Sequence, residues 1–165
     1  MATITLQGKE IHTIGRLPKE GDQAPEFELT KSDLSAVKLK DYQGQRVLLN
    51  IFPSVDTGVC ATSVRKFNEK AASLNNTKVL CVSKDLPFAF SRFCGAEGLH
   101  NVECLSDYKN GTFGKSYGVE IMDSAFSGLH ARAVVVLNES NKVIYSELVP
   151  EIAQEPNYEA ALNSL

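Results

Sequence analysis

The sequence has no long hydrophobic segment, no tryptophan and no excess of positive charge. None of its apolar runs approaches the roughly 18 residues that a membrane-spanning helix needs. The formal net charge is -3 and like charges do not form long runs, so the electrostatic signature of a nucleic-acid or anionic-membrane binder is missing. We therefore expect that neither a membrane nor a nucleic acid is a partner.

The amino terminus lacks the features of an export signal, because it has neither a basic start nor a continuous apolar core. Polar and apolar residues alternate there instead, which favours a β-hairpin within about residues 1–16. The four cysteines are too sparse for a disulfide-rich secreted scaffold. Together these features favour a cytoplasmic protein whose cysteines are kept reduced.

The rest of the pattern predicts one α/β domain that spans residues 1–165. Segments with helical spacing begin near residues 57 and 86, and a last helix is expected near the carboxyl terminus. The strands are predicted from short apolar runs at 46–52, 78–83, 102–106 and on both sides of a turn at 138–141. Such alternation indicates a sheet covered by helices.

Cys60 is predicted to lie at the start of a helix, directly after a buried strand and a turn that begins at Pro53. Unpaired backbone N–H groups and the helix dipole favour a thiolate at such a position. Two interpretations remain open from position alone: Cys60 is a nucleophile, or it fills the first turn as a small apolar group. Thr57 is similarly open, since its hydroxyl either caps the helix or faces a group held at the sulfur.

The other cysteines and the histidines give weaker signals. Cys81 and Cys104 lie inside apolar strand runs, which favours buried, inert side chains. No Cys-x-x-Cys pair occurs, which argues against a thiol–disulfide exchange enzyme. We expect no metal site, because three residues lack ligand spacing with any cysteine: His12, His100 and His130. Of these, His130 is expected to be a loop residue.

Four segments resemble those of peroxiredoxins, in the subgroup of bacterial thiol peroxidases. Residues 53–60, PSVDTGVC, match the family's Pro-x-x-x-Thr-x-x-Cys motif. Residues 83–95, SKDLPFAFSRFCG, resemble the segment around the subgroup's second reactive cysteine. Residues 128–138, GLHARAVVVLN, resemble its arginine-bearing strand, and residues 21–29, GDQAPEFEL, its early strand.

The resemblance implies a thioredoxin-like fold, with a central mixed sheet and an N-terminal hairpin, and a role in antioxidant defence. Hydrogen peroxide and organic hydroperoxides would be reduced to water and alcohols. Cys60 would be the peroxidatic residue that forms a sulfenic acid, and Cys94 would resolve it as an intramolecular disulfide. Thioredoxin would then reduce this disulfide. No metal, haem or flavin is required, and a homodimer is implied.

The same resemblance implies roles for the residues around the sulfur. Negative charge develops on the leaving oxygen as the O–O bond breaks, so donors aimed at the oxygens lower the barrier. Thr57, the backbone N–H of Cys60 and Arg132 are the candidate donors, and Pro53 would shape the pocket floor. Without the resemblance, Arg132 would be interpreted as a solvated strand end.

An apolar loop before Arg132 suits one wall of a pocket for alkyl or lipid hydroperoxides. Its residues are Met122, Phe126 and Leu129, and the alternative is that they anchor the loop onto the core. The subgroup resemblance favours organic hydroperoxides.

The predicted disulfide imposes a mechanical requirement. Its α-carbons must approach within about 7 Å, so one of the two cysteine-bearing helices is expected to unwind partly. The competing functional hypothesis is a redox sensor or binding module without catalysis. That hypothesis gives no chemical reason for having Thr57, Cys60, Cys94 and Arg132 together.

Overall fold

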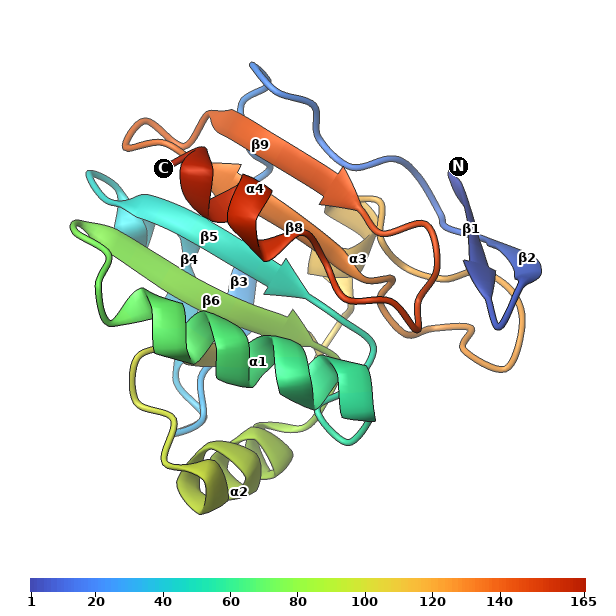
Figure 1. Cartoon of the computed structure of the whole chain (residues 1–165), viewed down its shortest axis with the longest axis horizontal. Coiled ribbons are helices and arrows are strands. Elements are labelled where there is room, and N and C mark those ends of the chain that lie inside the picture. Colours follow the sequence, from blue (N-terminus) through green and yellow to red (C-terminus); the bar gives the residue numbers. More distant parts are fainter.

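The computed structural model describes all 165 residues and is built around a seven-stranded mixed sheet (Figure 1). The strand order is β4-β3-β7-β6-β5-β8-β9, with β5, β6 and β7 parallel and the other pairings antiparallel. The strands are β3 (Glu28–Thr30), β4 (Ala36–Lys38), β5 (Arg46–Ile51), β6 (Thr77–Ser83), β7 (Glu103–Ser106), β8 (Ala133–Leu137) and β9 (Val143–Leu148). The predicted helix-covered sheet is confirmed.

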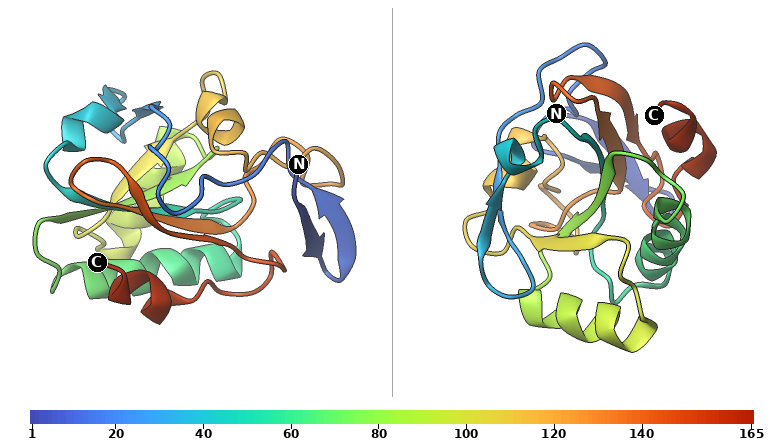
Figure 2. Two further views of the ribbon diagram at one scale, coloured as in Figure 1. Left: turned by 90° about the horizontal axis from the view of Figure 1, so that it is seen from above. Right: turned by 90° about the vertical axis from the view of Figure 1, so that its left-hand side faces the viewer.

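Helices cover both faces of this sheet. The elements are α1 (Gly58–Ala71), α2 (Pro87–Glu97), α3 (Thr112–Ser116), α4 (Tyr158–Asn163) and a 3₁₀ helix, η1 (Leu39–Tyr42). Figure 2 shows α1 and α4 on one side and α3 on the other. Two large apolar clusters correspond to these faces, one beneath α1, α2 and α4 and one beneath η1 and α3.

The central strands are buried on both faces, which is why they appear in the sequence as continuous apolar runs. In β5, Leu48 packs into the cluster beneath α1, whereas Leu49 and Ile51 pack into the opposite cluster. All three side chains are fully buried. The buried strand predicted at 46–52 is therefore confirmed, and its carboxyl end delivers the chain to α1.

The N-terminal hairpin consists of β1 (Thr3–Leu6) and β2 (Lys9–His12), as predicted. Its turn residue Gly8 has a φ of 80°, a conformation that glycine adopts without steric penalty. The hairpin projects from the main sheet, as Figure 1 shows. Glu151 anchors it by accepting hydrogen bonds from Thr5 Oγ1 at 3.0 Å and from the Gly8 N–H at 2.9 Å.

The structure differs from the sequence expectations in four elements. β4 and η1 were not predicted, because a strand of three residues and a single turn give too short a pattern. α1 ends at Ala71, before Leu74. α2 is a regular helix of 11 residues despite Gly95, and it ends on Gly98 with a φ of 65°.

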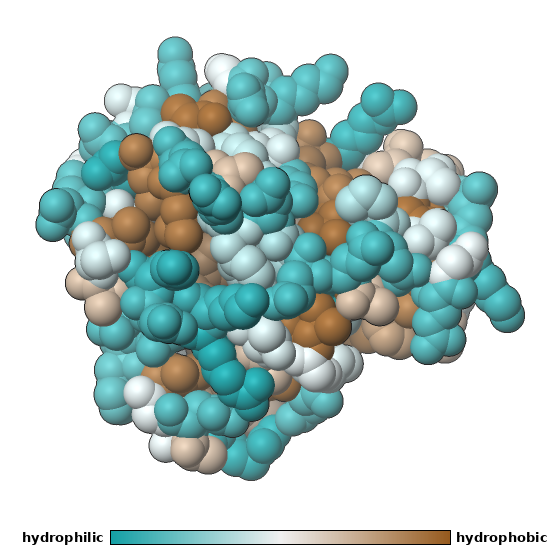
Figure 3. Space-filling model, viewed as in Figure 1, coloured by the Kyte–Doolittle hydropathy of each residue, from teal (hydrophilic) through white to brown (hydrophobic).

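The surface has the character of a globular domain. Figure 3 shows hydrophilic residues over much of the face that carries α1 and α4, with apolar residues in small groups between them. None of the helices is both long enough and apolar enough to cross a membrane.

Candidate functional site

Cys60 is the third residue of α1, and its side chain is fully buried. The helix follows β5 after a connection of six residues, 52–57, so the end of a central strand fixes where it begins. The backbone N–H groups of Gly58, Val59 and Cys60 make no hydrogen bond within the chain. The sulfur therefore lies beside free donors at the positive end of the helix dipole.

Arg132 lies immediately before β8, and its side chain is 1% exposed, so its interpretation as a solvated strand end is wrong. Its Nη2 donates to Cys60 Sγ at 3.3 Å, and its Nε donates to the carbonyl of Ile152 at 2.7 Å. Its Nη1 is buried and has no partner. Because a guanidinium is permanently charged, a buried one favours an anion beside it, here the Cys60 thiolate.

A cavity of about 170 Å³ is lined by Arg132, whereas the fully buried Cys60 lies behind it and is not a lining residue. Of the residues predicted for the site, it is lined by Pro53, Thr57, Phe126 and Arg132. The remaining lining residues are Leu6, Gln7, Gly58, Val59, Ile152 and Ala153. The motif residues and the apolar loop are therefore brought together at one cavity.

Two of the predicted pocket residues lie elsewhere. Met122 is 49% exposed, and neither Met122 nor half-buried Leu129 lines the cavity. The apolar wall is completed instead by Leu6 from the hairpin and Ile152 from the C-terminal loop. No sequence pattern pointed to these two residues, since they are far from the motif along the chain.

Thr57 occupies the position before the first residue of α1 but does not cap the helix through its side chain. Its hydroxyl donates to the Ser54 carbonyl at 3.0 Å, so the capping interpretation is wrong. This bond uses the hydroxyl proton and leaves the oxygen as an acceptor toward the cavity that Thr57 lines.

Asp85 was missed by sequence analysis and fixes the turn before α1. Its carboxylate accepts from Ser54 Oγ at 2.7 Å and from the Val55 N–H at 2.9 Å, and it also accepts from Ser83 Oγ. The residue follows β6 and directly precedes the start of α2. Its place between a buried strand and a helix-initiating proline was the available signal.

Cys94 lies in α2 and is half-buried. Its Sγ is 3.1 Å from Cys104 Sγ, and this hydrogen bond lowers the pKa of the Cys94 thiol. Cys81 and Cys104 are buried, as predicted, and all four cysteines are free.

The two sulfurs of the predicted disulfide are held over different strands. Cys60 contacts Arg132 at the start of β8, whereas Cys94 contacts β7. The two residues lie on different helices, and no contact joins their sulfurs. Joining the sulfurs therefore requires at least one helix to leave its place.

Exposed ion pairs join the two helical segments. Arg92 Nη2 is 2.7 Å from Asp56 Oδ1, and Arg65 Nη2 is 2.7 Å from Glu97 Oε1. Exposed pairs contribute little to stability, so they present only a small obstacle to movement of α2.

His130 is fully buried, so its description as an ordinary loop residue is incomplete. Its Nε2 is 2.9 Å from Asp107 Oδ2, and its ring lies against Phe113. Asp107 also accepts from the backbone N–H of Gly114 in α3. The pair therefore fixes α3 to the sheet. No group of three His, Cys, Asp or Glu side chains is placed to hold a metal ion.

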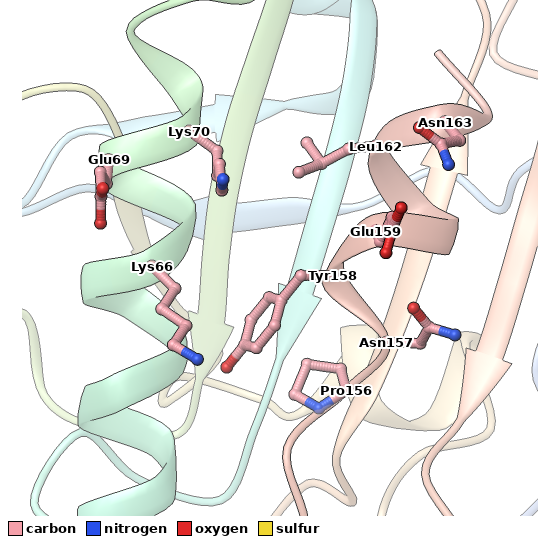
Figure 4. A pocket seen from close by; sticks show the side chains of 9 residues that line it. All are labelled: Lys66, Glu69, Lys70, Pro156, Asn157, Tyr158, Glu159, Leu162 and Asn163. Atoms are coloured by element: carbon pink, nitrogen blue, oxygen red, sulfur yellow. The ribbon is translucent and has the colours of Figure 1, made fainter.

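The largest surface hollow, about 730 Å³, lies away from every cysteine, between α1 and α4 (Figure 4). Lys66 and Tyr158 approach each other across it, with the Lys66 nitrogen 5.0 Å from the centre of the aromatic ring. No cysteine lines it, so the smaller cavity lined by Arg132 is the candidate site.

Comparisons with known proteins agree with this arrangement. A family model described as Redoxin matches residues 19–162. The chain is 59% identical over 165 residues to a thiol peroxidase of Mycobacterium tuberculosis strain H37Rv, covering 100% of this chain and 99% of that protein. It is 56% identical over 165 residues to a thiol peroxidase of Corynebacterium glutamicum, with the same coverage.

Solved structures support the same fold. A peroxiredoxin-like protein from Aquifex aeolicus has a TM-score of 0.93 at 39% identity, over 99% of this chain and 95% of that one. A thiol peroxidase from Chromobacterium violaceum has a TM-score of 0.91 at 24% identity, with the same coverage, and is similar in fold. The predicted thioredoxin-like fold with an N-terminal hairpin is thereby confirmed.

The contact between Arg132 and Cys60 can be tested with Arg132→Lys. Lysine keeps the charge, but it has a single nitrogen. It therefore cannot donate to the Ile152 carbonyl and to the Cys60 sulfur from two separate nitrogens, as arginine does. Hydrogen bonds to charged groups contribute about 1.5–3 kcal/mol, so the reaction of Cys60 with hydrogen peroxide should slow by about 10- to 100-fold. Peroxide consumption by reduced protein measures the rate. The exposed control Arg16→Lys should react normally, and a normal rate for Arg132→Lys would refute the role of this contact.

Proposed function

Because this chain belongs to the Redoxin family, and within it to the thiol peroxidases, we propose that Cys60 and Cys94 are its reactive residues. The chain is a thiol-dependent peroxidase, which reduces a peroxide at the expense of a thiol. The observation that carries the residue assignment is the buried Arg132 guanidinium, 3.3 Å from Cys60 Sγ at the base of the cavity.

In the first step, the Cys60 thiolate attacks the terminal oxygen of a hydroperoxide. An S–O bond forms, the O–O bond breaks, and water or an alcohol leaves after protonation, while Cys60 becomes a sulfenic acid. The unpartnered Nη1 of Arg132 and the free N–H of Cys60 are donors available to the oxygens. Thr57 contributes an acceptor for the hydroperoxide proton, and Pro53 forms part of the floor.

In the second step, the Cys94 thiol attacks the Cys60 sulfenic acid, forming a disulfide and releasing water. Its lowered pKa favours the nucleophilic thiolate. Because the two sulfurs lie on different helices and make no contact with each other, this step includes local unwinding of α1 or α2. α2 ends at an exposed glycine and its ion pairs with the α1 segment are exposed, which supports its movement. Its unwinding also has to expose Phe90 and Phe93, which pack in the apolar cluster beneath α1.

Thioredoxin is the proposed reductant of this disulfide, in the cytoplasm. Turnover requires that the disulfide be reduced after every cycle, and a reducing compartment supplies the electrons. Free cysteines throughout the chain are consistent with that setting. Cell fractionation that placed the protein with periplasmic markers would contradict the compartment.

Organic hydroperoxides are the proposed preferred substrates. Leu6, Val59, Phe126 and Ile152 give the cavity an apolar wall that suits an alkyl chain. The proposal includes Phe126 but gives Met122 and Leu129 no contact with substrate, because neither lines the cavity.

A homodimer and a single domain of residues 1–165 complete the proposal. Leu86 and Phe88, at the start of α2, are 52% and 66% exposed, and such apolar exposure is typical of a contact surface. Sedimentation equilibrium should give twice the chain mass, and Phe88→Glu should lower that mass. A monomeric wild type would contradict the dimer.

The anchored hairpin should unfold together with the sheet, in one thermal transition.

The reaction can be tested in an assay that couples cumene hydroperoxide reduction to thioredoxin, thioredoxin reductase and NADPH. Cys60→Ser should abolish NADPH oxidation, because it removes the attacking sulfur. Cys94→Ser should consume peroxide once per chain and then stop turning over with thioredoxin. Wild-type activity in Cys60→Ser would overturn the assignment, and a redox sensor without catalysis would show no turnover in the wild type.

The substrate preference can be tested with Phe126→Ala. This change removes part of the apolar wall, and full burial of such a side chain is worth about 1.5–3 kcal/mol. Because Phe126 is half-buried and forms only part of the wall, about half of this free energy should be lost. The KM for cumene hydroperoxide should therefore rise by about four- to tenfold, while that for hydrogen peroxide stays unchanged. Met122→Ala, the control outside the cavity, should alter neither value. Equal effects of Phe126→Ala on both substrates would contradict an alkyl-binding role.

A further inference from the structure

Three of the four cysteines form a cluster that does not include Cys60. Cys94 Sγ lies 3.1 Å from Cys104 Sγ, between α2 and β7. Cys81 is directly opposite Cys104 in the neighbouring strand β6. The proposed peroxidase cycle uses only Cys94 of these three, so the proximity of Cys104 is unexplained by that cycle.

The contact makes the two sulfurs chemically different. Hydrogen bonding to Cys104 lowers the pKa of Cys94, whereas hydrogen bonds to Cys81 and Cys94, together with burial, raise the pKa of Cys104. Cys104 is therefore the partner that retains its proton, and Cys94 is the one with thiolate character. This polarised pair is already assembled in the folded protein.

The pair is also close to solvent. A surface hollow of about 360 Å³ is lined by Cys94 and Cys104 together with Leu99, His100 and Val102. Although Cys104 is only 5% exposed, a disulfide between these two residues would lie at the base of this hollow. A reductant could reach it without unwinding either helix.

The folded structure places Cys94 much nearer to Cys104 than to the position required for a bond with Cys60. Closing the gap between Cys94 and Cys104 to a disulfide requires an approach of about 1 Å. A bond from Cys94 to Cys60 requires at least one helix to leave its place, since the cysteines lie on different helices and Cys60 Sγ is held by Arg132. Refolding of that helix therefore returns Cys94 toward Cys104 and Cys60 toward Arg132.

We infer that Cys104 is a further redox-active residue. By thiol–disulfide exchange it replaces Cys60 as the disulfide partner of Cys94. Once Cys94 is oxidised, it no longer contributes to the raised pKa of Cys104. The Cys104 thiol then loses its proton to solvent, and the resulting thiolate attacks the Cys94 sulfur of the Cys60–Cys94 disulfide. The Cys94–Cys104 bond forms, the Cys60–Cys94 bond breaks, and the electron pair leaves on Cys60 as a thiolate. One disulfide is replaced by another, so no further oxidant or reductant takes part.

This exchange rests on the proposed function, which supplies the Cys60–Cys94 disulfide. Its consequence is that Cys60 returns to Arg132 as a thiolate while the chain still holds one disulfide. Cys60 can then reduce a second hydroperoxide before any reductant arrives. A fully reduced chain should therefore consume two peroxide molecules, ending with a Cys94–Cys104 disulfide and a sulfenic acid on Cys60.

The test is a titration of reduced, desalted protein with hydrogen peroxide, followed by non-reducing peptide mapping. The wild type should consume two equivalents per chain, and after the first equivalent Cys94 should be joined to Cys104. Cys104→Ala should consume one and retain the Cys60–Cys94 disulfide, a twofold loss. Cys81→Ala, which removes a buried thiol from the adjacent register position, should still consume two.

The outcomes separate this inference from the proposed function. A wild type that consumes one equivalent and contains only the Cys60–Cys94 disulfide would overturn the role of Cys104 and leave the peroxidase assignment intact. If Cys60→Ser consumed as much peroxide as the wild type, the proposed function itself would fail, and this inference with it. The wild-type mapping decides the matter even if Cys104→Ala does not fold.

Discussion

The burial of one permanent positive charge constrains the whole site. Removing a guanidinium from water is costly unless hydrogen bonds and an opposite charge compensate. Arg132 finds these partners in the Ile152 carbonyl and the Cys60 sulfur, which come from the C-terminal loop and from α1. The start of β8 therefore fixes the helix and the loop relative to the sheet. The remaining nitrogen, Nη1, is left without a partner beside the cavity, where a substrate oxygen can accept from it.

The sheet order gives the site its second constraint, which separates peroxide reduction from disulfide formation. β5 and β6 separate the strand beside Arg132 from the strand that carries Cys104. In the proposed mechanism, peroxide reduction takes place in the intact fold, whereas joining Cys60 to Cys94 requires part of the fold to open. At the surface α2 is joined to the α1 segment by the exposed ion pairs of Arg65 and Arg92, while Phe90 and Phe93 hold it in the apolar cluster beneath α1.

Sequence patterns were sufficient for features that depend on neighbouring residues. The buried strand ending at Ile51, the helix beginning next to Cys60 and the hairpin turn at Gly8 follow from apolar runs, helical spacing and glycine chemistry. Arg132 could be assigned a functional role only through a family resemblance, since its charge and its position at one end of an apolar run favoured an exposed side chain. The contacts of Leu6, Asp85 and Cys104 could not be deduced, because each depends on segments brought together by strand order and not by local sequence.

The N-terminal hairpin contributes a wall to a cavity whose reactive residues all come from elsewhere. Leu6 faces the cavity, yet the hairpin lies outside the stretch that matches the Redoxin model. It is attached through Glu151, through backbone hydrogen bonds of Thr5 and through the packing of Ile4 and Ile11. Its sequence can consequently diverge without disturbing the buried charge or the sulfur chemistry. Evolution therefore has a separate means of changing which hydroperoxide is preferred, by altering a peripheral hairpin while the chemical centre is preserved.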